Sequence, residues 1–316
     1  MKNANRTTIG TLSLPVATAA LALLLTSNMV MADNSYSSKL LLTGGVSQVE
    51  GAAGGGLTPW AVIGGYGTGE EIGANLHFSH ADAQDFALST AGLTVGLYDR
   101  VELSLAEQRF NVSKLNSALG GLLGTSDIKQ TIAGVKVRLA GEAVLDQDTW
   151  LPQISAGVQY KKNQEEKLVK FLGAKDDAGV DYYLSATKLF IGQSLLVNST
   201  LRLTKANQLG ILGFGSEDNN SYEPQLEFSA AYLLSRNLTV GAEYRMKPNN
   251  LNKSNLPNGT LAEDDWWDIF IAYAPTKNIS LTAAYVNLGN IVDGNKLGLR
   301  GFADQQATYL SVQLGF

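Results

Sequence analysis

The chain has 316 residues, of which 45% are hydrophobic and 17% are charged, and it contains no cysteine. The lack of cysteine excludes a disulfide scaffold, a thiolate metal site, a cysteine nucleophile and a lipid anchor on an N-terminal cysteine. The 24 Lys+Arg and 29 Asp+Glu give a net charge of -5, which offers no basic surface for a phosphate backbone and argues against nucleic-acid binding.

Residues 1–32 have the three parts of a secretory signal peptide. Lys2 and Arg6 carry the only charges, an apolar run follows, and Val30-Met31-Ala32 suits cleavage before Asp33. The apolar run is shorter than the roughly 20 residues that a spanning helix needs, and Pro15 interrupts it. We therefore expect export of the mature chain, and no later apolar run in it is long enough to span a bilayer as a helix.

Residues 33–70 form a glycine-rich segment that contains the run Gly51 to Gly56. Two arrangements are open for it: an additional hairpin made of residues 39–43 and 58–63, or a plug folded into the lumen of a barrel. Neither face of residues 58–66 is polar, although a lumen-lining strand needs one polar face. The pattern therefore favours the plug.

Residues 71–316 alternate between apolar and polar side chains in segments of about ten residues, the length that a tilted strand needs to cross a bilayer. The pattern predicts twelve strands, at residues 71–79, 86–97, 100–110, 127–140, 151–162, 180–190, 194–205, 222–233, 237–247, 265–275, 278–288 and 305–316. The expected fold class is therefore all-β: a closed antiparallel transmembrane β-barrel of twelve strands, or of fourteen if the hairpin forms. Closure is required because an unpaired backbone group in hydrocarbon costs several kcal/mol.

Three features favour a membrane barrel over a soluble sandwich, which also alternates. Short links, such as residues 98–100 and 235–237, alternate with long polar stretches, such as residues 111–126 and 163–179, which are expected to be solvated outer loops. Aromatic residues, among them Tyr160 and Tyr273, fall at the ends of the apolar rows, as in the girdles of membrane barrels. The last strand ends in an aromatic residue, Phe316, which resembles the C-terminal signature of Gram-negative outer-membrane barrels.

The segments Leu42-Thr43-Gly44-Gly45-Val46, residues 50–60 and Tyr98-Asp99-Arg100-Val101-Glu102-Leu103 resemble the proteobacterial outer-membrane family known as domain of unknown function 3034. The resemblance implies a barrel in the outer membrane. It implies no substrate.

Charged residues on the polar rows are predicted to line the lumen. They are Glu102, Lys136, Arg138, Lys161, Arg202, Glu227, Glu243, Arg245 and Asp268. Acids and bases nearly balance along these rows, whereas a strongly selective channel needs a ring of one sign. The sequence therefore predicts a weakly selective, porin-like channel for small solutes, or a lumen closed by charge pairs.

Two alternatives remain open: a non-conducting envelope protein that acts through its outer loops, and a hydrolase built around His77, or around His80 with Ser79 and Asp82. The acidic run from Glu263 to Asp265 is expected to be a solvated loop, since no repeated spacing of oxygen ligands supports Ca²⁺ binding. No catalytic residue, metal or cofactor is predicted. Expected partners are outer-membrane lipid, lipopolysaccharide, the barrel assembly machinery through Phe316, and small solutes.

Overall fold

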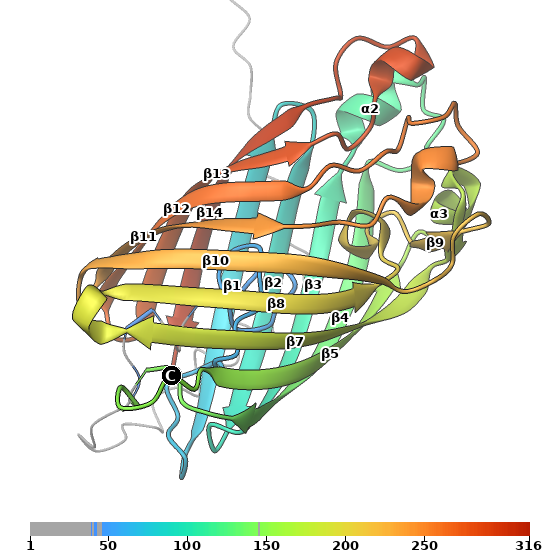
Figure 1. The fold of residues 1–316 in the computed structure, drawn as a ribbon. Coiled ribbons are helices and arrows are strands. Elements are labelled where there is room, and N and C mark those ends of the chain that lie inside the picture. The colour runs from blue at the N-terminus through green and yellow to red at the C-terminus, as the bar shows by residue number, and fades with distance from the viewer. Residues whose placement is uncertain (1–38, 40, 43–45, 145) are drawn as a thin grey trace, which may run out of the picture. The chain divides into compact units, whose positions relative to one another are not determined.

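Twelve antiparallel strands close into a barrel in which neighbours along the chain are neighbours in the wall (Figure 1). The computed structural model describes residues 39, 41–42, 46–144 and 146–316, so the expected signal peptide lies outside the described residues. The wall consists of β1 (Ile72–Ala83), β2 (Ala87–Leu97), β3 (Val101–Asn111), β4 (Asp127–Ala140), β5 (Gln153–Asn163), β7 (Ala178–Phe190), β8 (Leu195–Thr204), β10 (Glu223–Ser235), β11 (Leu238–Arg245), β12 (Trp266–Thr276), β13 (Ile279–Gly289) and β14 (Gln305–Gly315). Pairing of β1 with β14, from Asn75 opposite Gly315 to Ala83 opposite Ala307, closes the ring.

The predicted count of twelve strands is confirmed, and the fourteen-strand alternative is wrong. The described residues between 39 and 66 form only isolated bridges, Ser47 with Ala53 and Gly54 with Pro59. The main difference in strand bounds is at β1, which continues to Ala83, so His80 lies within the strand and does not begin the outer connection. The cause is pairing on both sides, because β2 and β14 both extend to this level.

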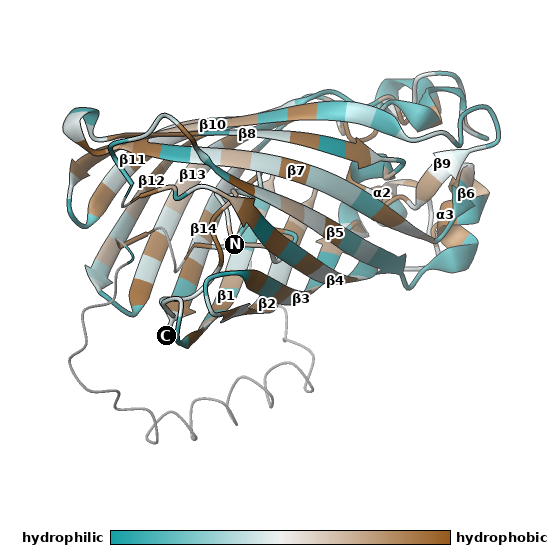
Figure 2. Ribbon diagram, turned by 60° about the horizontal axis from the view of Figure 1, so that its bottom comes forward, coloured by the Kyte–Doolittle hydropathy of each residue, from teal (hydrophilic) through white to brown (hydrophobic). Residues whose placement is uncertain are grey.

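The outward rows of the strands are apolar, as the alternation predicts. Exposed side chains on these rows include Leu103, Leu105, Val135, Val137, Leu184, Leu201, Ile269, Ile271, Leu281, Leu310 and Val312. Figure 2 shows brown, hydrophobic positions alternating along the strands. In water this surface would be strongly unfavourable, since burial of apolar area yields about 25 cal/mol per Å². The barrel therefore spans a membrane, with hydrocarbon against these rows. No described helix is long and apolar enough to cross a bilayer.

Five of the six connections at one end of the barrel are long, and they carry the short helices α2 (Ser113–Ala118), α3 (Glu166–Leu172), η3 (Asn207–Gly210), η4 (Asn250–Lys253) and η5 (Gly294–Leu297). The opposite end has η2 (Ile191–Gln193) and mostly tight turns, but the link between β4 and β5 has twelve residues, 141–152. We call the first end the long-loop end. Near it the outward rows become polar, with Asp82, Arg109 and Lys162.

The loops at this end are packed more tightly than their polar sequences suggest. The predicted solvated loop at 163–179 keeps charged side chains such as Glu166 and Lys170 exposed, but Leu168, Val169 and Leu172 of α3 are buried. The next residues form β6 (Ala174–Asp176), which pairs with β9 (Phe214–Ser216). Residues 206–216 are buried throughout, although they follow β8 as an expected outer connection. Apolar side chains spaced along these loops therefore serve a second packing layer that covers the end of the barrel.

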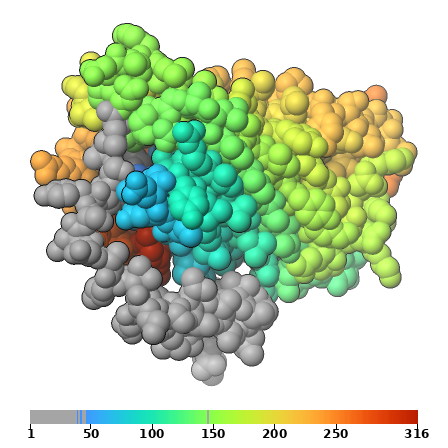
Figure 3. Space-filling view, turned by 90° about the horizontal axis from the view of Figure 1, so that it is seen from below, coloured from blue at the N-terminus to red at the C-terminus, as the bar shows by residue number. Residues whose placement is uncertain are grey.

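Residues 46–66, which we call the inner segment, lie inside the barrel (Figure 1). Nineteen of these 21 residues are buried, Gly56 and Tyr66 being the partly exposed ones. Viewed from below, closely packed side chains cover the visible part of the wall, with colours that run from cyan through green to yellow across this face (Figure 3). A ring of this size is wider inside than side chains alone can fill, so the inner segment occupies space that would otherwise hold water.

Candidate functional site

Glu50 is the only charged residue of the inner segment, and it lies at the centre of a buried network of charges. Its carboxylate contacts three basic side chains from three different strands, Lys161 of β5, Arg202 of β8 and Arg245 of β11. The distance from Glu50 Oε2 to Arg245 NH1 is 2.8 Å, and to Arg202 NH2 it is 3.5 Å. The inner segment is thus fixed to one side of the wall by opposite charge.

Two wall carboxylates complete the network. Asp181 Oδ2 lies 2.6 Å from Lys161 Nζ and 3.3 Å from Arg202 NH1. Glu227 Oε1 lies 2.5 Å from Arg202 Nε and 3.4 Å from Arg245 Nε. Three acids therefore balance three bases, which offsets the large cost of removing each ion from water. Burial alone would raise the pKa of Glu50, but Arg245, Lys161 and Arg202 together hold this pKa well below its usual range.

A second ion pair, between Glu102 of β3 and Lys136 of β4, also holds the inner segment. Lys136 Nζ lies 2.9 Å from Glu102 Oε2, with both side chains almost fully buried. Lys136 also donates to the backbone carbonyls of Ala53 and Trp60, each at 3.1 Å. Glu102 accepts from the backbone N–H groups of Ala53 at 3.1 Å and Gly64 at 2.8 Å. One wall pair therefore contacts four backbone groups of the irregular inner segment, of which only the carbonyl of Ala53 also has a backbone partner, the N–H of Trp60.

Glu243 of β11 forms the third anchor. Its carboxylate accepts from Leu57 N–H, Thr58 Oγ1 and Ser229 Oγ, each at 2.7 Å. The glycine run allows this close approach, because a Cβ atom added to Gly55 would lie 2.0 Å from Glu243 Oε1. The carboxylate of Asp268 lies opposite Glu243 in the pairing of β11 with β12. Within the described chain, these two acids have no ion pair to a base.

Neutral hydrogen bonds fix the rest of the inner segment. The carbonyl of Pro59 accepts from Thr200 Oγ1 at 2.8 Å, Ser185 Oγ at 3.2 Å and Asn198 Nδ2 at 3.3 Å. Trp60 donates from Nε1 to Ser229 Oγ at 3.0 Å. Wall side chains, and not wall backbone, provide these contacts.

The connection between β8 and β10, residues 205–222, enters the lumen from the long-loop end, and we call it the inserted loop. Its backbone carbonyl at Leu209 accepts from Gln130 Nε2 at 3.2 Å and from Lys161 Nζ at 3.3 Å. Asn163 Nδ2 donates to the carbonyl of Ile211 at 2.7 Å. Gln208 and Leu209 adopt positive φ angles of 45° and 63°, which are unfavourable for residues with a side chain. Lys161 therefore contacts both obstructions of the lumen, the inner segment and this loop.

Lys247 and Glu263 hold the same loop from the other side. Lys247 Nζ lies 2.7 Å from Gln208 Oε1, 3.5 Å from Glu263 Oε2 and 4.4 Å from the centre of the Trp266 ring. Glu263 Oε2 accepts from Gln208 N–H at 2.9 Å. Burial lowers the pKa of Lys247 to about 8 and raises the pKa of Glu263 to about 7, in each case against the attraction of the other. The expectation that Glu263 belongs to a solvated acidic loop is therefore wrong.

The structure brings seven of the nine predicted lumen residues into contact with the inner segment or with the network around Glu50. They are Glu102, Lys136, Lys161, Arg202, Glu227, Glu243 and Arg245. Asp268 is also buried, beside Glu243. Arg138 lies at the tight-turn end of β4, where it pairs with Asp99 and with Glu142, 2.8 Å away.

Glu50 and Lys247 were not among the residues predicted for the site. Glu50 could have been found as the lone charge between residues 46 and 66. Lys247 could have been found by parity, because it lies within the predicted strand 237–247 on the same row as Glu243 and Arg245.

The two histidines lie on opposite faces of β1. His77 is fully buried inside the barrel, whereas His80 is exposed, with Nδ1 2.9 Å from Ser89 Oγ. Ser79 faces inward and contacts Ser311 and Tyr309, so it does not meet His80. No group of three or more His, Cys, Asp or Glu side chains suited to a metal ion occurs among residues 46–144 and 146–316.

The fold and the site define a class: a transmembrane β-barrel of the outer-membrane type, whose lumen is occupied by its own chain. The family model described as protein of unknown function (DUF3034) matches residues 43–313. The chain therefore belongs to this family, and the resemblance noted in the sequence is confirmed. No curated protein matches the sequence.

Solved structures similar to this chain include two porins. The KdgM porin is 12% identical, with a TM-score of 0.48, over 77% of this chain and 99% of that chain. The NanC porin is 8% identical, with a TM-score of 0.46, over 77% and 98%. Outer membrane phospholipase A from Escherichia coli is 11% identical, with a TM-score of 0.38, over 80% and 91%. Likenesses this distant do not bear on function.

Proposed function

We propose that this barrel is a channel for small solutes and that the inner segment closes it in the state described here. The observation that carries the proposal is how the inner segment is held. All backbone-to-backbone hydrogen bonds recorded for residues 46–65 join parts of the segment to each other, such as Val49 N–H to Gly56 O and Trp60 N–H to Ala53 O. The segment is thus a small folded unit of its own.

The polar contacts between residues 46–65 and the wall are ion pairs and hydrogen bonds from wall side chains, beside apolar packing of residues such as Val49 and Leu57; one backbone bond to the end of the wall, Tyr66 N–H to Phe316 O, lies at the end of the segment. Such contacts can be exchanged for water one at a time, because water satisfies the same donors and acceptors. A strand of the wall, in contrast, could leave only by breaking a continuous backbone ladder. Reversible contacts of this kind support a removable closure.

The charges left on the wall would set the selectivity of the open lumen. Acids and bases are interspersed on it, and no ring of one sign is formed by the buried residues. Side-chain filters that discriminate strongly between ions need such a ring. We therefore expect only mild selection by charge.

Planar-bilayer recording of two proteins tests this function: the full chain and a variant that lacks residues 46–63. We expect rare openings from the full chain and sustained ohmic conductance from the deletion variant. A control variant lacks residues 120–124, an exposed part of the connection between β3 and β4, and should behave like the full chain.

The deletion variant must first be shown to form a barrel, by a shift in gel mobility on heating. A folded deletion variant without conductance would overturn the channel proposal. That outcome would favour the second role that the sequence leaves open, a non-conducting envelope protein acting through its packed outer loops.

A hydrolase is a less favoured candidate, and one contact supports it. His80 Nδ1 lies 2.9 Å from Ser89 Oγ on the outer surface of the barrel, and a histidine beside a serine is the minimum of a nucleophile and its base. Esterase assays with Ser89→Ala and His80→Ala decide it: a loss of activity in both variants would support hydrolysis, and no activity in the parent chain would end the proposal.

A further inference from the structure

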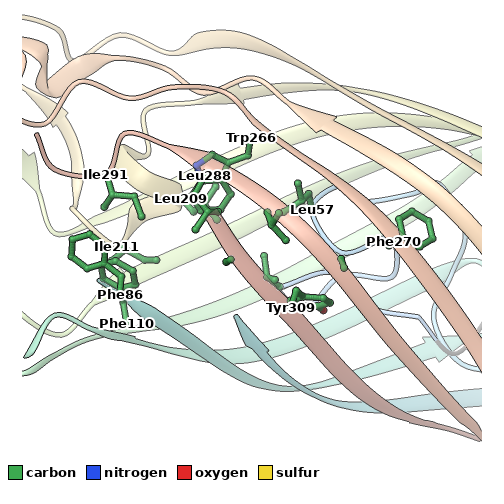
Figure 4. Packing of buried hydrophobic residues seen from close by; sticks show 14 of the residues in the cluster. Leu57, Phe86, Phe110, Leu209, Ile211, Trp266, Phe270, Leu288, Ile291 and Tyr309 are labelled. Carbon is green, nitrogen blue, oxygen red and sulfur yellow. The ribbon is translucent and has the colours of Figure 1, made fainter. Parts of the chain in front are cut away.

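A cavity of about 40 Å³ lies in the lumen, next to both the inner segment and the inserted loop. Val49 and Leu57 of the inner segment line one side, and Gln208 and Ile211 of the inserted loop line another. The wall contributes aromatic and aliphatic side chains, Phe110 and Trp266 among them. Figure 4 labels four of these side chains inside the barrel, Leu57, Phe110, Ile211 and Trp266. About 10–15 Å³ is enough for one water molecule, so the cavity has room for several heavy atoms.

The apolar character of this space contrasts with the rest of the lumen. Glu50, Glu102 and Glu243 make the deeper part highly polar, as described above. Nearer the long-loop end the inward rows carry apolar side chains, for example Phe110 and Val286. Phe86 and Phe110 stack there with ring centres 5.2 Å apart. A water-filled passage does not require such a lining.

The few polar side-chain atoms at the cavity have partners, with one exception. Gln208 donates from Nε2 to the carbonyl of Asn290 at 3.2 Å and accepts at Oε1 from Lys247. The hydroxyl of Tyr309 contacts Ser79 Oγ at 3.0 Å. Trp266 is 5% exposed, and its Nε1–H is the one lining side-chain donor without a hydrogen-bond partner in the described chain.

A buried water molecule needs two to four polar partners, and this cavity offers one. Apolar cavities that cannot satisfy water remain dry and take up small hydrocarbons instead. An unpaired indole N–H in such a place is unfavourable until it meets an acceptor. The lining therefore favours an occupant that is apolar over most of its surface and has one acceptor atom.

We propose that this cavity binds a small, uncharged, mostly hydrocarbon molecule with a single hydrogen-bond acceptor, which accepts from Trp266 Nε1. The site touches both the inner segment and the inserted loop, so an occupant contacts both obstructions at once. This inference concerns binding and does not depend on conduction.

Ligand-observed saturation-transfer NMR on the full chain in lipid nanodiscs tests the site, with cyclopentanone as the probe. Its ketone oxygen is one acceptor on a five-carbon ring. Methylenecyclopentane has nearly the same shape and no such acceptor. Empty nanodiscs measure partition of both probes into lipid. We expect saturable binding of cyclopentanone to the protein, and weaker binding of the hydrocarbon.

Three variants locate the binding. Trp266→Phe removes the donor and should weaken cyclopentanone binding about tenfold, while methylenecyclopentane binding changes less than about twofold. Trp267→Phe is the matched control, since Trp267 faces outward and is 39% exposed. Val286→Phe fills the cavity and should abolish binding of both probes; Ala83→Leu does the same with a smaller change if Val286→Phe fails to fold.

Two results would overturn the inference: no saturable binding of cyclopentanone to the parent protein, or equal affinity in the parent, Trp266→Phe and the cavity-filling variants. Because binding is measured without current, a channel that conducts but binds no probe refutes this inference alone, and a non-conducting barrel that binds the probe refutes only the channel.

Discussion

Glu50 Oε2 accepts a hydrogen bond from Arg245 NH1 at 2.8 Å, and these residues are 195 positions apart in the chain. Glu50 belongs to the irregular inner segment, and Arg245 is the last residue of β11. Through this contact, and those with Arg202 and Lys161, a single carboxylate links the inner segment to three strands of the wall. Glu50 is therefore the residue on which the proposed closure depends most.

Glu50→Gln should weaken closure. The substitution leaves three buried bases with two acids, and an uncompensated buried charge costs on the order of 3–5 kcal/mol. We expect more frequent channel openings, a preference for anions, and faster protease cleavage within residues 46–66. Asp218→Asn, at a polar position in the connection between β8 and β10, is the control. Unchanged current and unchanged proteolysis in Glu50→Gln would show that the network does not hold the segment.

A disulfide between the inner segment and the wall should lock the lumen. Thr58 Oγ1 and Ser229 Oγ are 2.5 Å apart, and the chain has no cysteine of its own. The double variant Thr58→Cys with Ser229→Cys is expected to cross-link under oxidation and to show no openings until dithiothreitol is added. Each single variant controls for the substitutions. Equal conductance in the oxidised and reduced double variant would mean that solutes do not pass where the inner segment lies.

The pair Lys247 and Glu263 should make the inserted loop pH-dependent. The pKa of Glu263 is raised from 4.5 to about 7. Between pH 4.5 and 7 the packed inserted loop therefore binds more protons than the released loop, and the stability of the packed loop falls as the pH rises to 7. The pKa of Lys247 is lowered from 10.5 to about 8, so stability rises again above pH 8. Each pKa shift of about 2.5 units changes the stability of the packed loop by about 3 kcal/mol.

We therefore expect the weakest protection of residues 207–213 at pH 7–8, measured by hydrogen exchange corrected for intrinsic rates. Three other charged groups lie near the pair. Arg245 acts on both Lys247 and Glu263, Asp264 acts on Lys247, and Asp265 accepts a hydrogen bond from the backbone N–H of Lys247. The variant Lys247→Met with Glu263→Gln should remove the minimum. A minimum that persists in this variant would assign the pH dependence to another group.

A charge on the outward row should impair the barrel more than a charge elsewhere. Leu281 of β13 is 40% exposed on the apolar face, and an arginine near the bilayer midplane costs about 2–4 kcal/mol. We expect Leu281→Arg to lower the denaturant midpoint of the folded barrel in liposomes. Arg is tolerated near the interface, so Asp82→Arg, in the polar part of the β1 outward row, is the control. Equal midpoints would contradict contact of this face with hydrocarbon.

The strands could be predicted almost residue by residue, for a local reason. Alternation with period two places Ile269 and Ile271 toward lipid and Asp268 toward the lumen, whatever the partner strands are. Observed strand bounds differ from predicted ones where pairing extends a strand, as at Ala83, because pairing with neighbouring strands sets strand length and the pattern does not.

The lumen could be predicted only in part. Parity alone identifies inward residues such as Lys136 and Arg202. Parity also places Lys247 inward, on the row of Glu243 and Arg245. It does not tell that Glu263 becomes buried, because Glu263 lies in a loop whose packing depends on residues 206–216.

The amino-acid sequence by itself determined a membrane barrel of twelve strands, since contact with hydrocarbon demands an uncharged outer row and a closed sheet, and both leave a mark on every strand. Only the tertiary structure decided how the inner segment is held inside the barrel. Glu50 meets Lys161, Arg202 and Arg245 because strand closure brings three distant segments to one side of the lumen, and the cavity beside Trp266 exists because two unrelated loops stop short of each other. Such encounters depend on position in space, which a local pattern of side chains does not specify.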